Sequence, residues 1–306
     1  MSNLNTKKRN SLIELYRFLF AMNVVIGHGL FPIKTNYFGP DRISVEFFFI
    51  LSGFLFFGSL KKIQNMKTGE AIKTTLISKI KPILIPMIIG LISNTILNFL
   101  SNHKPMIEIF RYLWYIPAML AILVVYAILR TLIKKDNLFW CIVAVLFLAT
   151  TIMRFSGNEK LFYFDYIRST ASVSLGMLIA KIPKLSLKNK MINRLLLIPV
   201  SVAIFIIVFY GLAKQHVGYE AALDLLLYPL LIYISFGIEF NFAPFDYLGS
   251  LSFGIYAFQC PARLVKYIGV PTPWIPFGII ILAAITEDAI KKIIKHYKKQ
   301  LTNKKI

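Results

Sequence analysis

The stretch from Arg17 to Phe54 decides what kind of chain this is. It reads RFLFAMNVVIGH over residues 17–28 and VEFFFILSGF over residues 45–54, with a short polar loop between the two segments. Charged or titratable residues inside apolar runs of this kind usually mark a site or a pathway in a membrane. On an α-helix, eleven residues at ~100° each come within about 20° of three full turns. Arg17 and His28 are therefore predicted on one face of one helix, about 16 Å apart along its axis.

The composition is that of an integral membrane protein. The chain has 306 residues, of which 57% are hydrophobic, and its mean hydropathy is +0.66. Soluble globular domains contain about 45–50% apolar residues. At ~20 residues per span plus loops, this length fits about ten transmembrane helices and leaves little for a separate soluble domain. The expected fold class is all-α, a polytopic helical bundle that forms a single domain over residues 1–306.

Ten spans and their orientation follow from hydropathy and charge. If the N-terminus is cytoplasmic, 24 of the 35 Lys and Arg residues fall on the cytoplasmic side and nine on the outer side. Basic residues gather on the cytoplasmic side of membrane proteins, so both termini are predicted to be cytoplasmic. This rule also accounts for the net charge of +21, with a lipid bilayer rather than nucleic acid as the partner. The predicted spans lie near residues 11–31, 43–60, 82–101, 112–133, 138–153, 162–180, 194–213, 221–240, 248–268 and 274–292.

A cleaved signal peptide, a disulfide framework and a metal site are not expected in this chain. The basic residues 7–9 before an apolar run resemble a signal peptide. However, the run is long, contains Arg17 and lacks a small-residue cleavage site, so it is interpreted as a retained first span. Cys141 and Cys260 both fall in predicted spans, which argues against a disulfide framework. No cluster of metal-ligating residues is visible, and no metal is expected.

The orientation brings two polar residues to a similar depth. The first span rises outward, which puts Arg17 in the inner third of the membrane and His28 near the outer end. The second span descends, which puts Glu46 near its outer end as well. Ser52 and Gly53 then fall near mid-membrane, where small residues let helices or a ligand approach closely.

The motif in these two spans resembles that of a known family. An arginine and a histidine with ten residues between them in the first span, followed by a Val-Glu-Phe-Phe-Phe-Ile-Leu-Ser-Gly-Phe segment opening the second, are similar to the motif of the membrane acyltransferase-3 family. The resemblance implies an enzyme that O-acylates sugars of the cell envelope or of secreted glycans. It further implies acyl-CoA as the donor, with acetyl as the commonest acyl group.

Two later stretches extend the resemblance. LWYIPA over residues 113–118 is similar to the family's Trp-Tyr/Phe-Leu-Pro segment and makes Tyr115 a cavity candidate, whereas Trp114 also fits an interfacial aromatic belt. Arg168 stands before SLGMLIA at residues 174–180, as an arginine does in the family. The resemblance makes Arg168 a second candidate for binding the donor.

A third stretch lies near the end of the chain. LGSLSFGIY over residues 248–256 is similar to the family's Leu-Gly-x-Ile-Ser-Tyr-x-Leu-Tyr segment. It adds Ser252 and Tyr256 to the acceptor or cavity candidates Ser52, Gly53 and Tyr115. The family commonly continues to a histidine before a proline. Here Gln259 takes that place, a neutral hydrogen-bonding group, followed by Cys260 and Pro261.

His28 and Glu46 are the candidate catalytic residues. His28 is the one histidine inside a predicted span, and a histidine with its ordinary pKa of about 6.5 suits deprotonation of a sugar hydroxyl. A packing hydrogen bond to a neighbouring helix is the alternative role for His28. Glu46 is the candidate partner that orients the imidazole, and pairing with Arg42 at the outer boundary is its alternative.

Arg17 is the first candidate for donor binding. Its guanidinium suits phosphate or carboxylate, so it would hold the phosphates of coenzyme A or polarise the thioester carbonyl. The alternatives are an ion pair with Glu14 and an extended side chain that reaches the inner headgroups.

The sequence thus predicts a multi-pass O-acyltransferase of a bacterial plasma membrane. The alternative is a transporter of glycans or lipid-linked sugars, because intramembrane charges serve transport equally well. Transporters often show internal repeats with paired broken helices, and no convincing repeat is visible here.

Overall fold

Helices make up all the regular secondary structure in the described chain, which covers residues 10–28, 30, 41–81, 83–102, 114–156, 164–183, 190–214, 221–238, 240–267 and 274–303 of a computed structural model. They are α1 (Ser11–Gly27), α2 (Asp41–Gln64), α3 (Thr68–Ile80), α4 (Leu84–Asn102), α5 (Tyr115–Leu132), α6 (Asp136–Phe155), α7 (Phe164–Lys181), α8 (Lys190–Lys214), the π-helical η2 (Leu223–Leu227), α10 (Tyr228–Gly237), α11 (Ala243–Tyr267) and α12 (Trp274–Asn303). The all-α class is therefore confirmed.

Each of the ten predicted spans overlaps a helix, with η2 and α10 together matching the eighth. Two differences stand out. Helix α3 lies in a segment interpreted as a cytoplasmic loop, because its short amphipathic pattern gives no hydropathy signal. Helix α12 continues past the predicted end at residue 292 to Asn303, since no glycine or proline stops it there.

Three described helices are long and apolar enough to cross a membrane by themselves: Ser44–Gln64, Tyr115–Leu132 and Asp136–Phe155. A fourth span results if the bent pair Thr68–Ile80 and Leu84–Ser93 is counted as one. The remaining predicted spans are shorter or carry polar and charged side chains, so the number ten stays a prediction.

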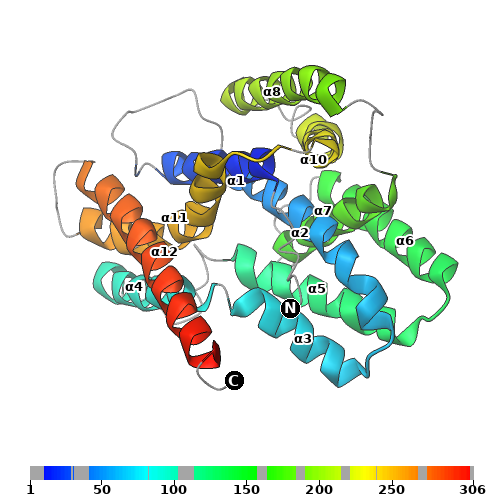
Figure 1. Cartoon of the computed structure of the whole chain (residues 1–306), viewed down its shortest axis with the longest axis horizontal. Helices are drawn as coiled ribbons and strands as arrows, with labels where there is room; N and C mark the ends of the chain where they lie inside the picture. The colour runs from blue at the N-terminus through cyan, green and yellow to red at the C-terminus, as the bar shows by residue number, and fades with distance from the viewer. Residues whose placement is uncertain are drawn as a thin grey trace.

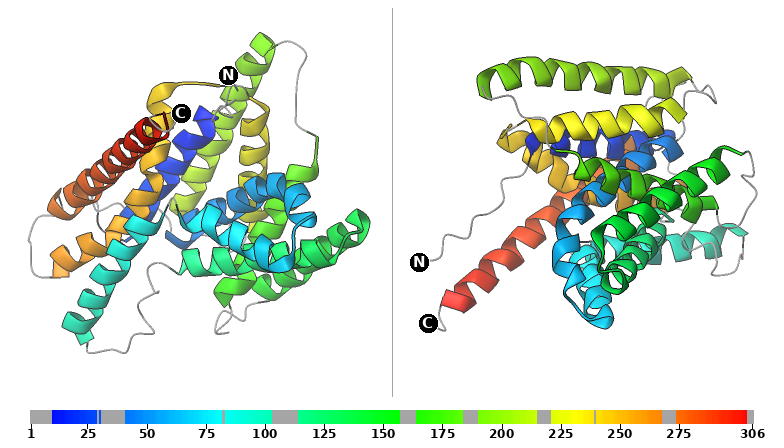
Figure 2. Two further views of the ribbon diagram at one scale, coloured as in Figure 1. Left: turned by 60° about the horizontal axis from the view of Figure 1, so that its bottom comes forward. Right: turned by 90° about the vertical axis from the view of Figure 1, so that its right-hand side faces the viewer.

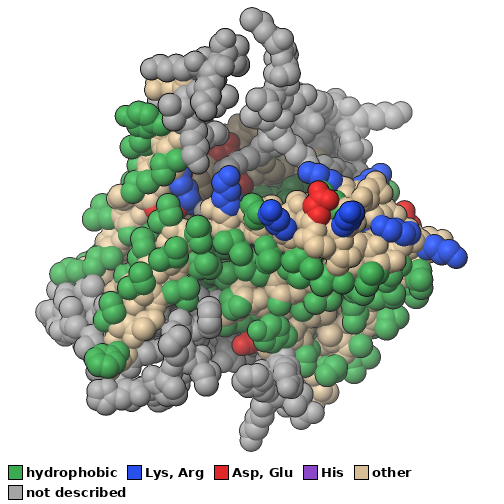
Figure 3. Space-filling model, turned by 90° about the horizontal axis from the view of Figure 1, so that it is seen from below, with side chains coloured by type: hydrophobic (Ala, Val, Ile, Leu, Met, Phe, Trp, Pro, Cys, Tyr) green, Lys and Arg blue, Asp and Glu red, His purple; other side chains and the backbone are tan. Residues whose placement is uncertain are grey.

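The molecular surface is rich in large apolar side chains. Ile92 on α4, Leu148 on α6 and Ile206 on α8 are each more than half exposed. Figure 3 shows hydrophobic side chains covering much of one face, with Lys and Arg side chains gathered in a band across it. A soluble monomer rarely exposes apolar surface on this scale, which fits a surface in contact with lipid.

The helices form three packed groups (Figures 1 and 2). Helices α2, α3, α5, α6 and α7 make one group, and α1, α4, α11 and α12 make a second. Helix α10 packs against α8 in the third group, and contacts between α1 and α2 join the first two groups. The candidate site lies where these first two groups meet.

Two glycines allow α2 and α7 to touch. A methyl group on Gly53 would come within 2.0 Å of the backbone carbonyl oxygen of Val173, and one on Gly176 within 2.0 Å of that of Ile50. Because real carbon–oxygen contacts are never so short, only glycine fits at either crossing. The predicted close approach at Gly53 is therefore an approach of helix α7, not of a ligand.

Replacing Gly53 by alanine is expected to destabilise the fold by about 2 kcal/mol or more, because the backbones of α2 and α7 must separate. Gly58 is a matched control on the same helix, since nothing lies within 4 Å of a methyl group placed there. Gly58→Ala should be neutral or stabilising, as alanine favours a helix by about 1 kcal/mol over glycine. Thermal unfolding of both variants in detergent measures the difference, and equal midpoints would contradict the packing.

Candidate active site

A cavity of about 760 Å³ opens between the first two helix groups. Six helices contribute to its lining, together with the turn at Ile83: α1, α2, α3, α5, α11 and α12. The charged and hydroxyl-bearing side chains are on Arg17, Ser52, Ser78, Lys79, Tyr115, Asp246, Tyr247, Ser250, Ser252, Tyr256, Asp288, Lys291 and Lys292. Five residues predicted for the site thus share one cavity: Arg17, Ser52, Tyr115, Ser252 and Tyr256.

The start of α1, which carries Arg17, is fixed by its N-cap. Asn10 Oδ1 accepts hydrogen bonds from the backbone N–H groups of Leu12 (3.1 Å) and Ile13 (3.3 Å), as is typical of an N-cap. Asn10 Nδ2 donates to the backbone carbonyls of Ser235 (2.6 Å) and Ile238 (2.9 Å) at the end of α10. The cap therefore ties α1 to a neighbouring helix, about two turns before Arg17.

Arg17 forms the ion pair with Glu14 that was its predicted alternative role. Arg17 Nη1 lies 2.7 Å from Glu14 Oε2 on the preceding turn, and the Arg17 side chain is 30% exposed against 10% for Glu14. Glu14 is itself fixed against Gly249 of α11, where a methyl group would collide with its side chain. Because Arg17 still lines the cavity, the pair holds the guanidinium in place and leaves part of it open to a ligand.

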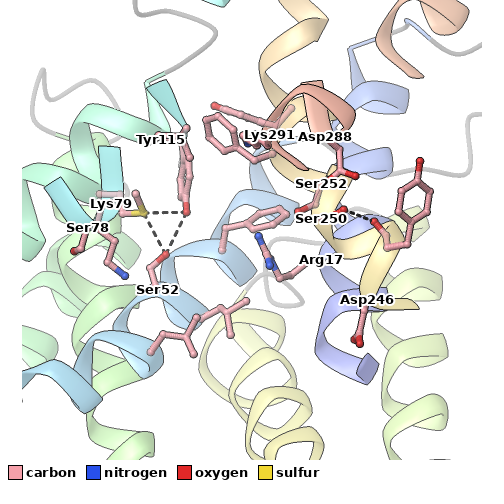
Figure 4. A pocket seen from close by; sticks show the side chains of 18 of the residues that line it. Arg17, Ser52, Ser78, Lys79, Tyr115, Asp246, Ser250, Ser252, Asp288 and Lys291 are labelled. Carbon is pink, nitrogen blue, oxygen red and sulfur yellow. Dashed lines mark hydrogen bonds between the residues drawn. The ribbon is translucent and has the colours of Figure 1, made fainter. Parts of the chain in front are cut away.

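Hydroxyl groups and a thioether form one wall (Figure 4). Ser52 Oγ lies 3.3 Å from Tyr115 Oη and donates to Met119 Sδ at 3.2 Å, and Tyr115 Oη lies 3.1 Å from the same sulfur. The rings of Tyr115 and Tyr256 meet edge to face at 5.8 Å. Ser252 Oγ donates to the carbonyl of Gly249 one turn earlier. This wall offers polar groups to a ligand from α2, α5 and α11.

Three lysines of the cavity were not among the predicted site residues. Lys79 reaches it from α3, and Lys291 and Lys292 reach it from the last part of α12. Lys291 pairs with Glu287 and Lys292 with Asp288, in both cases one helical turn away. Lys79 lies between two predicted spans. Its side chain faces the cavity because α3 is a helix that turns this position toward Arg17. Burial, and secondly the positive charge of Arg17, lower the pKa of Lys79.

Glu46 and Arg168 lie outside this cavity, in a buried ionic cluster (Glu46, Arg154, Arg168, Ser172 and Asp224). Arg168 donates to Glu46 Oε1 from Nε at 2.7 Å and from Nη2 at 2.6 Å. Ser172 donates to Glu46 Oε2, and Arg154 lies 3.3 Å from Oε1 while also pairing with Asp224. The fully buried Glu46 thus joins α2 to α6 and α7.

The ionic cluster bears on the roles predicted for Glu46 and Arg168. The described partners of Glu46 are arginines and a serine, so Glu46 neutralises buried guanidinium groups in this cluster, and its pairing with His28 stays a prediction. Arg168 does not line the cavity, and its guanidinium stacks over Trp114 at 5.4 Å. These contacts give Arg168 a structural role, and donor binding by Arg168 stays a prediction. The alternative partner of Glu46, Arg42, has a side chain outside the described residues.

His28 directly follows the last residue of α1. Its backbone N–H donates to the carbonyl of Val24 at 3.1 Å, and its side chain is half-buried. Because α1 is continuous from Ser11 to Gly27, the predicted rise of about 16 Å from Arg17 to His28 holds. His28 does not line the cavity.

Gln259 is a polar side chain buried without hydrogen-bond partners among the described residues. It is fully buried, and neither its Oε1 nor its Nε2 is hydrogen-bonded there. Ser11 meets Asp246, and Glu14 meets Gly249, so α1 and α11 run in parallel with an offset of 235 residues. Continuing this register places Gln259 beside Val24, one turn below His28. The predicted acceptor candidate and the predicted base thus belong to the same end of the α1–α11 pair.

No cluster of three or more metal-ligating side chains occurs within the described part of the chain. Comparison with protein families gives a match over nearly the whole chain: a family model described as an acyltransferase domain covers residues 10–286. Neither the curated proteins nor the solved structures compared with the chain include a significant match.

Proposed function

The chain belongs to the acyltransferase-3 family, and we propose that it transfers an acyl group, most simply acetyl, from acyl-CoA to a hydroxyl of a cell-envelope or exported glycan. It is an acyltransferase enzyme, and its family and apolar helices make it a membrane protein. The proposal adds a bacterial plasma membrane, ten spans and cytoplasmic termini.

One observation carries the proposal: Arg17, which lines the cavity, and the half-buried His28 lie on one continuous helix segment, about 16 Å apart along its axis. The cavity around Arg17 holds cations and hydroxyl groups suited to a charged donor. His28 supplies an imidazole directly after the last residue of α1. This arrangement supports a reaction in which donor and acceptor approach from opposite sides of the membrane.

In the proposed reaction His28 acts as the general base. The glycan hydroxyl oxygen forms an ester bond with the acyl carbonyl carbon, and the carbon–sulfur bond of the thioester breaks. The hydroxyl proton passes to His28 and then to the leaving thiolate, so the products are the glycan ester and free coenzyme A. Arg17 binds the donor in the cavity. Direct transfer and an acyl-enzyme relay both fit this balance.

The distribution of charge supports the proposed orientation. Lys79, Lys291 and Lys292 line the same cavity as Arg17, although α1, α3 and α12 are far apart in sequence. This is the side to which charge counting assigns the cytoplasm. A donor made in the cytoplasm would thus meet the basic end of the cavity first.

The test is acyl transfer by purified protein in lipid nanodiscs. With [¹⁴C]acetyl-CoA and a soluble oligosaccharide of the host's surface glycan, we expect saturable, protein-dependent label in the sugar and release of free thiol. A transporter would give neither product. Absence of both transfer and slow thioester hydrolysis, with a panel of acyl-CoA donors, would reject acyl-CoA as the donor.

A further inference from the structure

Lys79 is the cation of the cavity that has no acidic partner among the described residues. Arg17 pairs with Glu14, Lys291 with Glu287, and Lys292 with Asp288. The remaining acidic group of the lining, Asp246, accepts a hydrogen bond from Ser11 at 2.7 Å.

No described residue forms an ion pair with Lys79, although most of its side chain is covered. An ammonium group removed from water without a partner carries a cost of several kcal/mol. Arg17 adds to this cost, since its positive charge acts on Lys79 through the same cavity. Two cations that face one partly enclosed space, with one of them unneutralised, form a site for an anion.

We propose that Lys79 and Arg17 together bind the phosphate groups of the acyl donor, an inference that rests on the proposed function. The donor class is an acyl thioester tethered to a nucleotide diphosphate. Lys79 stands at the last turn of α3, before the bend into α4, and therefore at the predicted cytoplasmic boundary where such a donor enters.

The rest of the cavity suits the remainder of such a molecule. Phe48, Leu51, Met119 and Phe253 line the cavity with apolar surface beside the hydroxyl groups of Ser52 and Tyr115. A narrow, uncharged arm fits this region, while its phosphates stay at the basic rim. The volume of about 760 Å³ lies in the range of about 300–1,000 Å³ found for small-molecule sites.

The experiment compares coenzyme A with pantetheine, which lacks every phosphate group. Binding of each to wild type, Lys79→Met and Lys79→Arg is measured by calorimetry in nanodiscs. The matched control is Lys73→Met on the same helix, because Lys73 is exposed and does not line the cavity. Loss of a charged hydrogen bond should weaken coenzyme A binding about 10- to 100-fold in Lys79→Met. Pantetheine binding should stay unchanged, Lys79→Arg should retain most affinity, and Lys73→Met should equal wild type.

Two results would overturn the inference. One is an affinity of Lys79→Met for coenzyme A within twofold of wild type. The same conclusion follows if the substitution changes binding of phosphatidylglycerol in the nanodisc and leaves binding of coenzyme A unchanged. The other is equal affinity of the wild type for coenzyme A and pantetheine. Failure of the proposed function looks different, since coenzyme A would bind through Lys79 while acyl-CoA gave no transfer. In active protein, Lys79→Met should raise KM for acyl-CoA and leave kcat at saturation close to wild type.

Discussion

Replacing His28 by alanine is expected to lower acyl transfer by about 10²- to 10⁴-fold, the usual contribution of a general base. A sugar hydroxyl loses its proton as the ester forms, and no other histidine falls within a predicted span. The helix should survive the substitution, because His28 follows the last residue of α1 and contributes its backbone N–H to the final turn.

The loss should lie in kcat, with donor binding retained, because His28 does not line the cavity. Coenzyme A affinity measured on the same preparation is therefore an internal check that the protein is folded. His28→Gln keeps the volume and the hydrogen bonding without the basicity and should be equally inactive. His216→Ala, in a predicted loop, is the matched control and should keep full activity. An active His28→Gln enzyme would reduce His28 to a packing residue.

Replacing Glu46 by glutamine is expected to prevent accumulation of folded protein. The substitution leaves Arg168 and Arg154 buried with one fewer negative charge, and removal of one partner from a buried ion pair costs about 3–5 kcal/mol. That is a large part of the 5–15 kcal/mol by which proteins are typically stable. Yield in membranes and the unfolding midpoint in detergent measure the effect.

Asp165→Asn is the matched control for the ionic cluster. Asp165 also approaches Arg168, at 4.0 Å, but its side chain is 46% exposed, so its charge is screened by solvent. We expect less than about 0.5 kcal/mol of destabilisation there. A Glu46→Gln protein that folds normally but has lost its acyl transfer would contradict the structural role and restore Glu46 as the partner of His28.

The fold was largely predictable because long apolar runs in the sequence indicate membrane spans. All ten predicted spans overlap helices, and the small residue Gly53 correctly indicated a close approach between helices. Helix α3 escaped detection since thirteen residues with seven polar or charged positions give no such run. The length of α12 beyond its predicted end escaped detection for the same reason.

The candidate site was predictable only in part. Spacing along one helix is fixed by helix geometry, so Arg17 and His28 could be related correctly from sequence. Partners across helices depend on how each helix is rotated, so the ion pairs of Glu46 with Arg168 and Arg154 could not be deduced from depth in the membrane. Arg154 follows the predicted span 138–153 and gave no hint of its contact with Glu46, and Lys79, between two predicted spans, gave none of its place beside Arg17.

The most direct test of the account is the ester content of the host's surface glycan, measured by NMR. Three strains are compared: wild type, a deletion of the gene, and the deletion carrying His28→Ala at equal expression. The account predicts that one ester signal disappears in the deletion, returns with the wild-type gene, and does not return with His28→Ala. An unchanged ester pattern, with glycan missing from the surface of the deletion strain, would contradict acyl transfer and identify a transporter.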